Sequence, residues 1–312
     1  MATERVLAAR HGSVVRDVSA SPSTLSDYWA LTKPDVNLVV IITTAAGFGL
    51  GLPPELAPFP WLRLLHTVAG TALVAGGAAA LNQWLERSFD ARMRRTARRP
   101  VAAGRVEPVR ALAFGAAASV AGLAELAFGA GLLPSLLALG TLLSYLLIYT
   151  PLKRVTPLCT LAGAVPGAVP PLIGYAAARG RLDLEAWVLF AIVFLWQFPH
   201  VMAIAWMYRD DYDRAGYRVL PGGEARDGFV VHQTLLPLVA LVVASVLPAL
   251  TGEASATYAI GALVLSLGFV DCGTRFVVRR TGSAARQLLL ASIVYLPVLF
   301  ALMLLCRLLP RV

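Results

Sequence analysis

Stretches of about 20 apolar residues recur along the whole chain, and each is long enough to cross the hydrocarbon core of a bilayer. Of the 312 residues, 58% are hydrophobic and 14% are charged, whereas soluble domains average about 25% charged residues. We therefore expect an all-α, polytopic integral membrane protein with about nine transmembrane helices. The expected spans are residues 34–52, 64–85, 109–128, 132–150, 157–176, 187–207, 234–252, 256–271 and 288–307, with a very short break at Thr251-Gly252-Glu253.

A polar segment, residues 1–26, precedes the first span. It carries Arg5, Arg10 and Arg16, and no compact apolar core with a small-residue cleavage site follows it. We therefore interpret it as a flexible cytoplasmic tail and not as a removed signal peptide. Residues 27–312 are expected to form one transmembrane domain.

The placement of basic residues predicts the orientation of the chain. If the N-terminus is cytoplasmic, only five Lys and Arg residues lie outside, which leaves 22 of the 27 inside. Such a bias toward basic cytoplasmic loops is typical of membrane proteins. The five outer residues are Arg63, Arg179, Arg181, Arg307 and Arg311. We expect a multi-pass protein of the cell inner membrane with a cytoplasmic N-terminus and active site.

Charge and cysteine content exclude two other classes of function. The net charge of +9 follows mostly from this loop bias, and no soluble basic domain is present to bind nucleic acid. Cys159, Cys272 and Cys306 have no motif spacing. We interpret them as apolar core residues, not as a disulfide framework or a metal site.

Four carboxylates and an Asn lie near span ends, where a lipid-embedded chain tolerates them poorly. Asn82, Glu86 and Asp90 are spaced by four residues, so they would share one helix face over roughly 12 Å. Mg²⁺ prefers hard oxygen ligands and often keeps substrate phosphates as further ligands. This pattern indicates a magnesium site for a phosphorylated, lipophilic substrate. The alternative is ordinary helix-end polarity solvated by the cytoplasm.

A second acidic pair, Asp210-Asp211, closes the sixth span and suggests a weak internal repeat. Two such clusters predict two metal half-sites that face one central cavity open to the cytoplasmic side, with Asp211 as the preferred second ligand. The fifth span contains many helix breakers, which predicts an irregular helix that is buried in protein or lines this cavity. The breakers are Gly163, Pro166, Gly167, Pro170, Pro171 and Gly174.

Basic residues follow the first acidic cluster and the fourth span. Arg94, Arg95 and Arg98 lie in the loop after Asp90, and Lys153 and Arg154 end the fourth span. Guanidinium groups bind phosphate through paired donors, so we expect these five residues to bind diphosphate. The alternatives are that the arginines only set topology and that the Lys-Arg pair only anchors the chain at the interface.

A WQFPH sequence at residues 196–200 puts polar side chains inside a span, where they are costly unless partnered. Pro199 would kink the helix and expose backbone carbonyls. His200 lies about 15 Å of helix from the second acidic pair. We expect it to contact the substrate or an iron; the alternative is a hydrogen bond between helices.

Several of these motifs together resemble a known family. Asn82…Glu86…Asp90, followed by Met93-x-x-Thr96-x-Arg98-Arg99-Pro100, resembles the first signature of the UbiA-type intramembrane prenyltransferases. The segments 149–156, 163–174, 196–200 and 208–217 resemble the branch of that family that farnesylates haem. The resemblance covers about residues 28–308.

The chain departs from the family pattern at both acidic clusters. Glu86 stands where Asp is common, and Ser88 stands where a further Asp is frequent. Tyr208 and Tyr212 occupy the frame in which the wider superfamily often has Asp-x-x-x-Asp. Glu86 keeps the charge but adds one methylene, so the metal position is expected to shift.

The resemblance implies transfer of a farnesyl group from farnesyl diphosphate to a vinyl group of haem B, with Mg²⁺ as cofactor. It implies metal ligation by Asn82, Glu86, Asp90 and Asp211, and auxiliary binding of diphosphate by the basic residues named above. Aromatic faces would shield the allylic cation, and a haem A synthase is an implied partner. The implied haem or prenyl pocket comprises Trp84, Tyr149, Trp196, His200, Trp206, Tyr208 and Tyr212.

Two other functions stay open at this point. An aromatic-ring prenyltransferase of quinone biosynthesis would use the same metal and diphosphate chemistry with a flat phenolic acceptor. A transporter also has broken helices and buried polar groups, but it would not consume farnesyl diphosphate.

Overall fold

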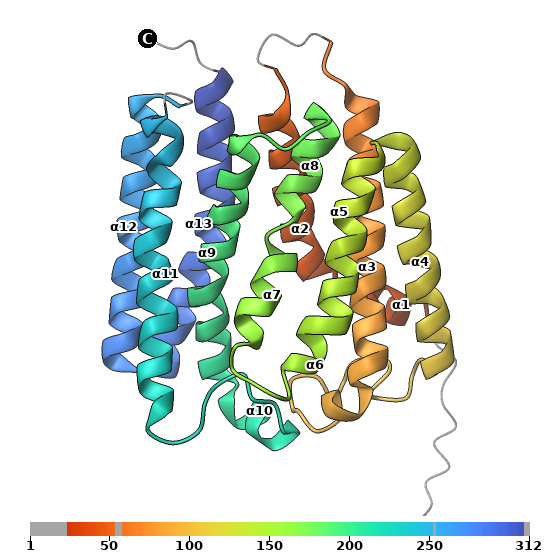
Figure 1. Ribbon diagram of the computed structural model, residues 1–312. Helices are drawn as coiled ribbons and strands as arrows, with labels where there is room; N and C mark the ends of the chain where they lie inside the picture. The colour runs from red at the N-terminus through yellow and green to blue at the C-terminus, as the bar shows by residue number, and fades with distance from the viewer. Residues whose placement is uncertain (1–23, 54–57, 252–253, 309–312) are drawn as a thin grey trace, which may run out of the picture.

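The structure, a computed structural model, describes residues 24–53, 58–251 and 254–308, and these residues form helices without any strand. Nine helices in this part of the chain are long and apolar enough to cross a membrane, as predicted, and they run side by side in one bundle (Figure 1). Outside the described residues lie Gly252-Glu253, Arg311 and most of the expected tail, including Arg5, Arg10 and Arg16.

The spans begin and end close to the predicted positions. They are α2 (Pro34–Gly51), α3 (Trp61–Asp90), α4 (Pro108–Gly129), the composite spans Leu132–Leu152 and Cys159–Arg179, α9 (Leu184–Met207), α11 (Ala225–Leu250), α12 (Ala256–Arg279) and α13 (Gly282–Leu308). The largest differences are at α11, which begins at Ala225, at α12, which continues to Arg279, and at α13, which begins at Gly282. Helices continue beyond the hydrocarbon core into the interface, where polar residues are tolerated.

Two composite spans are irregular helices. The fourth consists of α5 (Leu132–Leu143), the π-helix η1 (Ser144–Tyr149) and α6 (Thr150–Leu152). The fifth consists of α7 (Cys159–Gly167) and α8 (Pro170–Arg179), as its helix breakers predict. Proline lacks the N–H that would continue the helix and disfavours helical geometry in the residue before it, so the chain breaks before Pro170.

The cytoplasmic loops expected from the sequence gather at one end of the bundle, where α3 finishes with Asp90; we call this the polar end. Two short helices lie there, α1 (Leu25–Leu31) and α10 (Arg209–Ala215) (Figure 1). The backbone N–H of Arg218 donates to the Lys153 carbonyl at 2.7 Å. Arg105 pairs with Asp27 at 2.8 Å. These contacts hold loops from distant parts of the sequence together.

Close helix contacts explain why small residues are frequent within the spans. A Cβ atom at Gly174 of α8 would lie 1.9 Å from the carbonyl oxygen of Thr44 in α2, and one at Gly47 would lie 2.1 Å from the Pro171 carbonyl. Glycine therefore lets the two backbones approach, which is how membrane helices associate in a solvent as apolar as their side chains. Large side chains instead cover the outside; Phe128 is 93% exposed, as expected for contact with lipid.

We expect Gly174→Ala to lower the melting temperature of the solubilised protein by several degrees, because overpacking costs about 1–3 kcal/mol. Gly268→Ala is the matched control, since nothing lies within 4 Å of a Cβ built at that helical position. It should leave the melting temperature unchanged or slightly raised, as alanine favours a helix over glycine by about 0.5–1 kcal/mol. Equal melting temperatures for the two variants in a thermal unfolding assay would contradict the close contact of α2 with α8.

Candidate functional site

Asn82, Glu86 and Asp90 lie on one buried face at the end of α3, as their spacing predicts. Their exposed fractions are 1%, 3% and 1%, which excludes the alternative of side chains solvated by the cytoplasm. Buried carboxylates need compensating charge and hydrogen bonds. The structure supplies both from other elements.

Each buried carboxylate of the acidic clusters is paired with a cation. Glu86 Oε1 lies 2.6 Å from Lys153 Nζ, and Arg99 Nη1 donates to both oxygens of Asp90 at 2.8 Å. Asp211 pairs with Arg214. The acids and the cations that are expected to bind diphosphate therefore neutralise one another in this structure.

Asn82 links these pairs to the start of the first span. Its Nδ2 donates to Glu86 Oε2 at 2.9 Å, and its Oδ1 accepts from Lys33 Nζ at 3.2 Å. Sequence reasoning did not assign Lys33 a role, although it immediately precedes the first span. Its φ of 50° is left-handed, a backbone geometry that is uncommon outside glycine and clusters at functional sites. Burial, together with the nearby charges of Arg99 and Lys153, lowers the pKa of Lys33 to about 7.

Tyr217 closes the network from the loop after α10. Its hydroxyl donates to Glu86 Oε1 at 2.8 Å, and the Lys153 ammonium lies 5.6 Å from its ring centroid. Burial and the neighbouring carboxylate raise the pKa of Tyr217 well above its ordinary value, so the phenol stays protonated and keeps donating. Sequence reasoning quoted Tyr217 within a motif but gave it no function.

A cavity of about 400 Å³ is lined both by Lys33 of this network and by residues of the membrane-spanning helices. Lys33, Arg95 and Arg99 line one end of it. Its walls are largely apolar, with two tyrosines from the π-helix η1; they include Val36, Val40, Val74, Ala138, Leu142, Tyr145, Tyr149 and Ile173. A cationic end on an apolar chamber is suited to an anionic headgroup with a hydrocarbon tail.

Two further polar side chains line the same cavity. Gln197 Nε2 donates to the carbonyls of Ala164 and Val193 at 3.1 and 3.0 Å, which fixes the amide beside Gly167. Thr160 is 5% exposed, and its hydroxyl has no hydrogen-bond partner among the described residues. The oxygen of this hydroxyl is inaccessible to solvent, and an unpaired buried hydroxyl is costly.

The expected diphosphate-binding residues divide into two groups. Lys153 is buried in the network, and Arg95 lines the cavity while its guanidinium lies 5.0 Å from the ring centroid of Tyr208. Arg154 lies over the ring of Phe89 at 3.9 Å. Arg94, Arg95 and Arg98 are exposed. The structure instead brings Arg99 to the acids, a residue of the same basic motif that had been given no role of its own.

The expected aromatic pocket is spread over three regions, and of its seven members only Tyr149 lines the described cavity. Trp196 stacks on His200 at 4.7 Å, and both bond to Ser292 of α13, Trp196 through Nε1 at 2.8 Å and His200 through Nδ1 at 2.7 Å. Trp206 donates to the Arg280 carbonyl at 3.1 Å. These three residues therefore join α9 to its neighbours.

The other aromatic candidates contact arginines. Trp84 lies under Arg87, with the guanidinium 5.8 Å from its ring centroid. Tyr212 accepts a hydrogen bond from Arg95 Nη2 at 3.3 Å, and Tyr208 lies beside it under the same guanidinium. Tyr208 and Tyr212, which stand where the wider superfamily often has the two Asp residues of its second motif, thus position Arg95.

The donor atoms at the end of α3 fit a hard cation in their chemistry. Asn82, Glu86 and Asp90 offer amide and carboxylate oxygens, which are suited to Mg²⁺. Asp211 lies at the same end, where its Oδ2 accepts from the Arg95 backbone at 3.2 Å. In the part of the chain that the structure describes, no three His, Cys, Asp or Glu side chains converge as a metal centre. Metal binding would therefore require the present ion pairs to open.

Known proteins match this chain over most of its length. The model of the UbiA prenyltransferase family matches residues 40–304. A protein of Solibacter usitatus (strain Ellin6076) named protoheme IX farnesyltransferase is 48% identical over 289 residues, which cover 91% of this chain and 99% of that protein. A protein of Koribacter versatilis (strain Ellin345) with the same name is 41% identical over 292 residues, covering 91% and 94%.

Solved structures of low sequence identity share the fold. A digeranylgeranylglyceryl phosphate synthase superposes with a TM-score of 0.73 at 15% identity, covering 91% of this chain and 98% of the other. A UbiA homolog from Archaeoglobus fulgidus bound to GPP and Mg²⁺ gives 0.61 at 13% identity, covering 86% and 99%. At these identities the likeness establishes the fold alone.

We expect Arg99→Gln to weaken the binding of inorganic diphosphate in the presence of Mg²⁺ by about tenfold or more, because hydrogen bonds to charged groups contribute about 1.5–3 kcal/mol. Arg98→Gln is the matched control in the same loop and should change the affinity less than about twofold, as exposed charges contribute little. Isothermal titration calorimetry measures both. A larger loss for Arg98→Gln would show that the loop rearranges around the ligand.

Proposed function

The chain belongs to the UbiA prenyltransferase family, and from that premise we propose that it transfers the farnesyl group of farnesyl diphosphate to a vinyl group of haem B, giving haem O and diphosphate. The two relatives named protoheme IX farnesyltransferase are 48% and 41% identical over nearly their whole lengths. The protein is thus a prenyltransferase that spans the membrane several times. Its product would serve haem A synthesis.

One observation carries this proposal: buried acids and cations meet at the end of an apolar cavity. Glu86 and Asp90 face Lys153 and Arg99, and Lys33 and Arg99 line the cavity beside them. A prenyl diphosphate combines the same features, an anionic head that binds metal and a hydrocarbon tail. The cavity supports binding of the head at the polar end and of the tail between the helices.

Asn82, Glu86 and Asp90, with Asp211 nearby, are the residues that would hold Mg²⁺. Bound there, the metal would neutralise diphosphate as a Lewis acid. The Archaeoglobus fulgidus homolog of the same fold is bound to GPP and Mg²⁺, which supports this cofactor.

The protein's cations have a defined role in this proposal. Lys153 and Arg99 are held by the carboxylates in the structure, and both would turn to the diphosphate oxygens when the carboxylates take other partners. Lys33 and Arg95 lie at the same end. Paired donors placed where charge develops stabilise the leaving diphosphate, so they assist cleavage of the allylic C–O bond.

The reaction is balanced by one water molecule. The C–O bond breaks with its electron pair on diphosphate, farnesyl C1 bonds to the terminal vinyl carbon, and water adds to the inner vinyl carbon and loses a proton. Tyr145 and Tyr149 on the cavity wall would face the allylic cation with their rings. The fixed Gln197 amide, which lines the same cavity, would orient the water.

Two kinds of side chain would bind the haem acceptor. Arginines of the polar end would bind the haem propionates, and His200 would approach the iron through Nε2, because its Nδ1 bonds to Ser292. The basic loops support an inner-membrane protein with a cytoplasmic N-terminus and active site. Association with a haem A synthase remains a prediction.

Farnesyl transfer should require the metal. Protein in lipid nanodiscs, supplied with haem B and farnesyl diphosphate, is expected to form haem O and diphosphate with Mg²⁺ and to lose at least 100-fold in rate after chelation, with recovery on adding Mg²⁺. Liquid chromatography with mass detection follows the product. Farnesylation of a phenolic quinone precursor with unchanged haem would favour the quinone-pathway alternative, and no turnover of either acceptor would favour transport.

Substitutions on the buried face of α3 should separate ligand chemistry from folding. Asn82→Ala and Asp90→Ala are expected to reduce turnover below about 1% of wild type, because buried charged hydrogen bonds are lost, while the protein still inserts in the membrane. Glu86→Asp keeps the charge and should remain active. Near-normal turnover by either alanine variant would remove the metal assignment, and complete loss in Glu86→Asp would mean that the longer side chain is required.

A further inference from the structure

A second cavity, of about 290 Å³, lies at the end of the bundle opposite the polar end. It is surrounded by the last turns of α2, α8 and α13, the end of α11 and the first turns of α9 (Figure 1). The proposed farnesyl transfer makes no use of it. Because the cavity lies where the spanning helices end, it is at the level of the lipid headgroups on the side of the membrane opposite the polar end.

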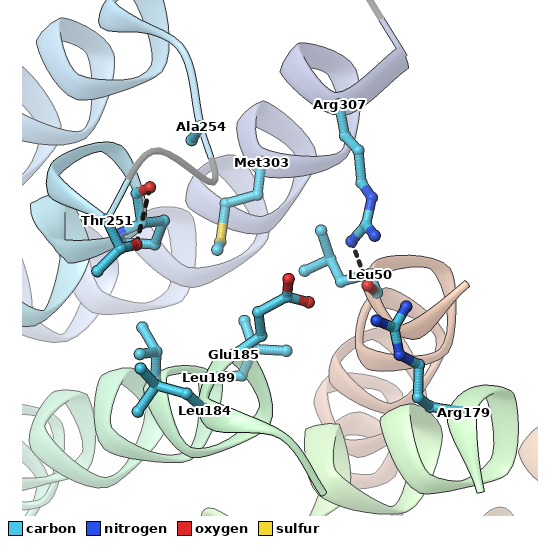
Figure 2. A pocket seen from close by; sticks show the side chains of 11 residues that line it. Leu50, Arg179, Leu184, Glu185, Leu189, Thr251, Ala254, Met303 and Arg307 are labelled. Carbon is cyan, nitrogen blue, oxygen red and sulfur yellow. Dashed lines mark hydrogen bonds between the residues drawn. The ribbon is translucent and has the colours of Figure 1, made fainter. Parts of the chain in front are cut away.

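Three charged side chains converge on this cavity. Figure 2 shows the guanidinium groups of Arg179 and Arg307 and the carboxylate of Glu185 pointing into one space. No ion pair joins Glu185 to either arginine in the described residues, since their charged atoms are more than 4.0 Å apart. These opposite charges line one cavity of about 290 Å³, a combination suited to a ligand that carries both signs.

Each of these side chains is held in place through another contact. Arg307 donates to the carbonyls of Leu50 and Leu52, the latter at 2.9 Å, at the end of α2. Arg179 Nε bonds to Asp183 at 3.2 Å. The Tyr175 hydroxyl donates to Glu185 Oε2 at 3.0 Å. Fixed side chains lose little entropy when a ligand binds, so the arrangement is preorganised.

The floor of the cavity is apolar and continues toward the lipid. Leu50, Val188, Leu189 and Met303 line it and are buried. Leu184 lies at the rim and is 68% exposed. The cavity therefore opens onto the lipid-facing surface at this residue. A small soluble anion would leave this apolar floor without a partner, whereas the glycerol and first methylenes of a lipid would cover it.

We propose that this cavity binds the headgroup of a zwitterionic phospholipid with a primary ammonium, phosphatidylethanolamine. The phosphate would lie against Arg179 and Arg307, which offer paired donors, and the ammonium would lie against Glu185. A purely anionic lipid such as phosphatidylglycerol gains the same arginines but gives Glu185 no cation. The Glu185 carboxylate therefore sets the preference for phosphatidylethanolamine over phosphatidylglycerol. The bound lipid would contact α2, α8, α9 and α13 together and so join these helices.

Native mass spectrometry of the full, delipidated chain tests this proposal without requiring catalysis. Phosphatidylethanolamine and phosphatidylglycerol with identical acyl chains are titrated, and the concentration that half-fills one site is measured. Wild type should retain phosphatidylethanolamine at a concentration at least fivefold lower. Glycerophosphoethanolamine, the headgroup without acyl chains, should not bind detectably; binding as tight as that of the lipid would overturn the assignment to a lipid.

Variants assign the preference to particular side chains. Glu185→Gln keeps a hydrogen-bond acceptor for Tyr175 and should bring the two lipids within twofold of each other, while Arg307→Gln should weaken both. Arg181→Gln is the matched control, because that side chain is 70% exposed, pairs with Asp183 and does not line the cavity. A wild-type protein without preference, or a Glu185→Gln protein that keeps it, would overturn the proposal.

Discussion

The pairing of buried carboxylates with cations from other elements is the interaction on which the polar end depends. Glu86 and Asp90 are buried at the end of α3 and cannot be solvated. Their partners Lys153 and Arg99 come from the end of the fourth span and from the loop after α3. A buried carboxylate without its cation is strongly destabilising, so these pairs fix the loops as well as the charges.

The same network joins the polar end to the apolar cavity. Asn82 bonds to Lys33 and Glu86, and Tyr217 bonds to Glu86 from the loop after α10. The cavity begins at Lys33 and Arg99 and continues between apolar walls. The polar network and the apolar walls therefore share α2, α3 and the fourth span, so a shift of any of these elements would move both parts of the site together.

Much of the fold follows from hydropathy, because span length is dictated by the bilayer and helices must satisfy their own hydrogen bonds. The shared face of Asn82, Glu86 and Asp90 follows from helical periodicity. The structure pairs Arg99, and not Arg98, with Asp90. This could not be predicted from the sequence, because the loop after α3 has no repeating geometry that would give a side-chain direction. For the same reason His200 and Trp196, at the right depth for a ligand, are directed to Ser292 of α13 by a helix packing that one sequence does not specify.

The π-helix η1 has a consequence for the rest of the fourth span. The Thr150 N–H donates to the Tyr145 carbonyl, five residues back, so the turn accommodates one residue more than an α-helix would. Removing a residue there would rotate everything downstream by about 100° around the axis. Thr150, which contacts Asn82 at 3.3 Å, and Lys153 would then face away from α3. The wide turn acts as an angular spacer, and the helical phase of this span is as much a determinant of the site as the identity of its side chains.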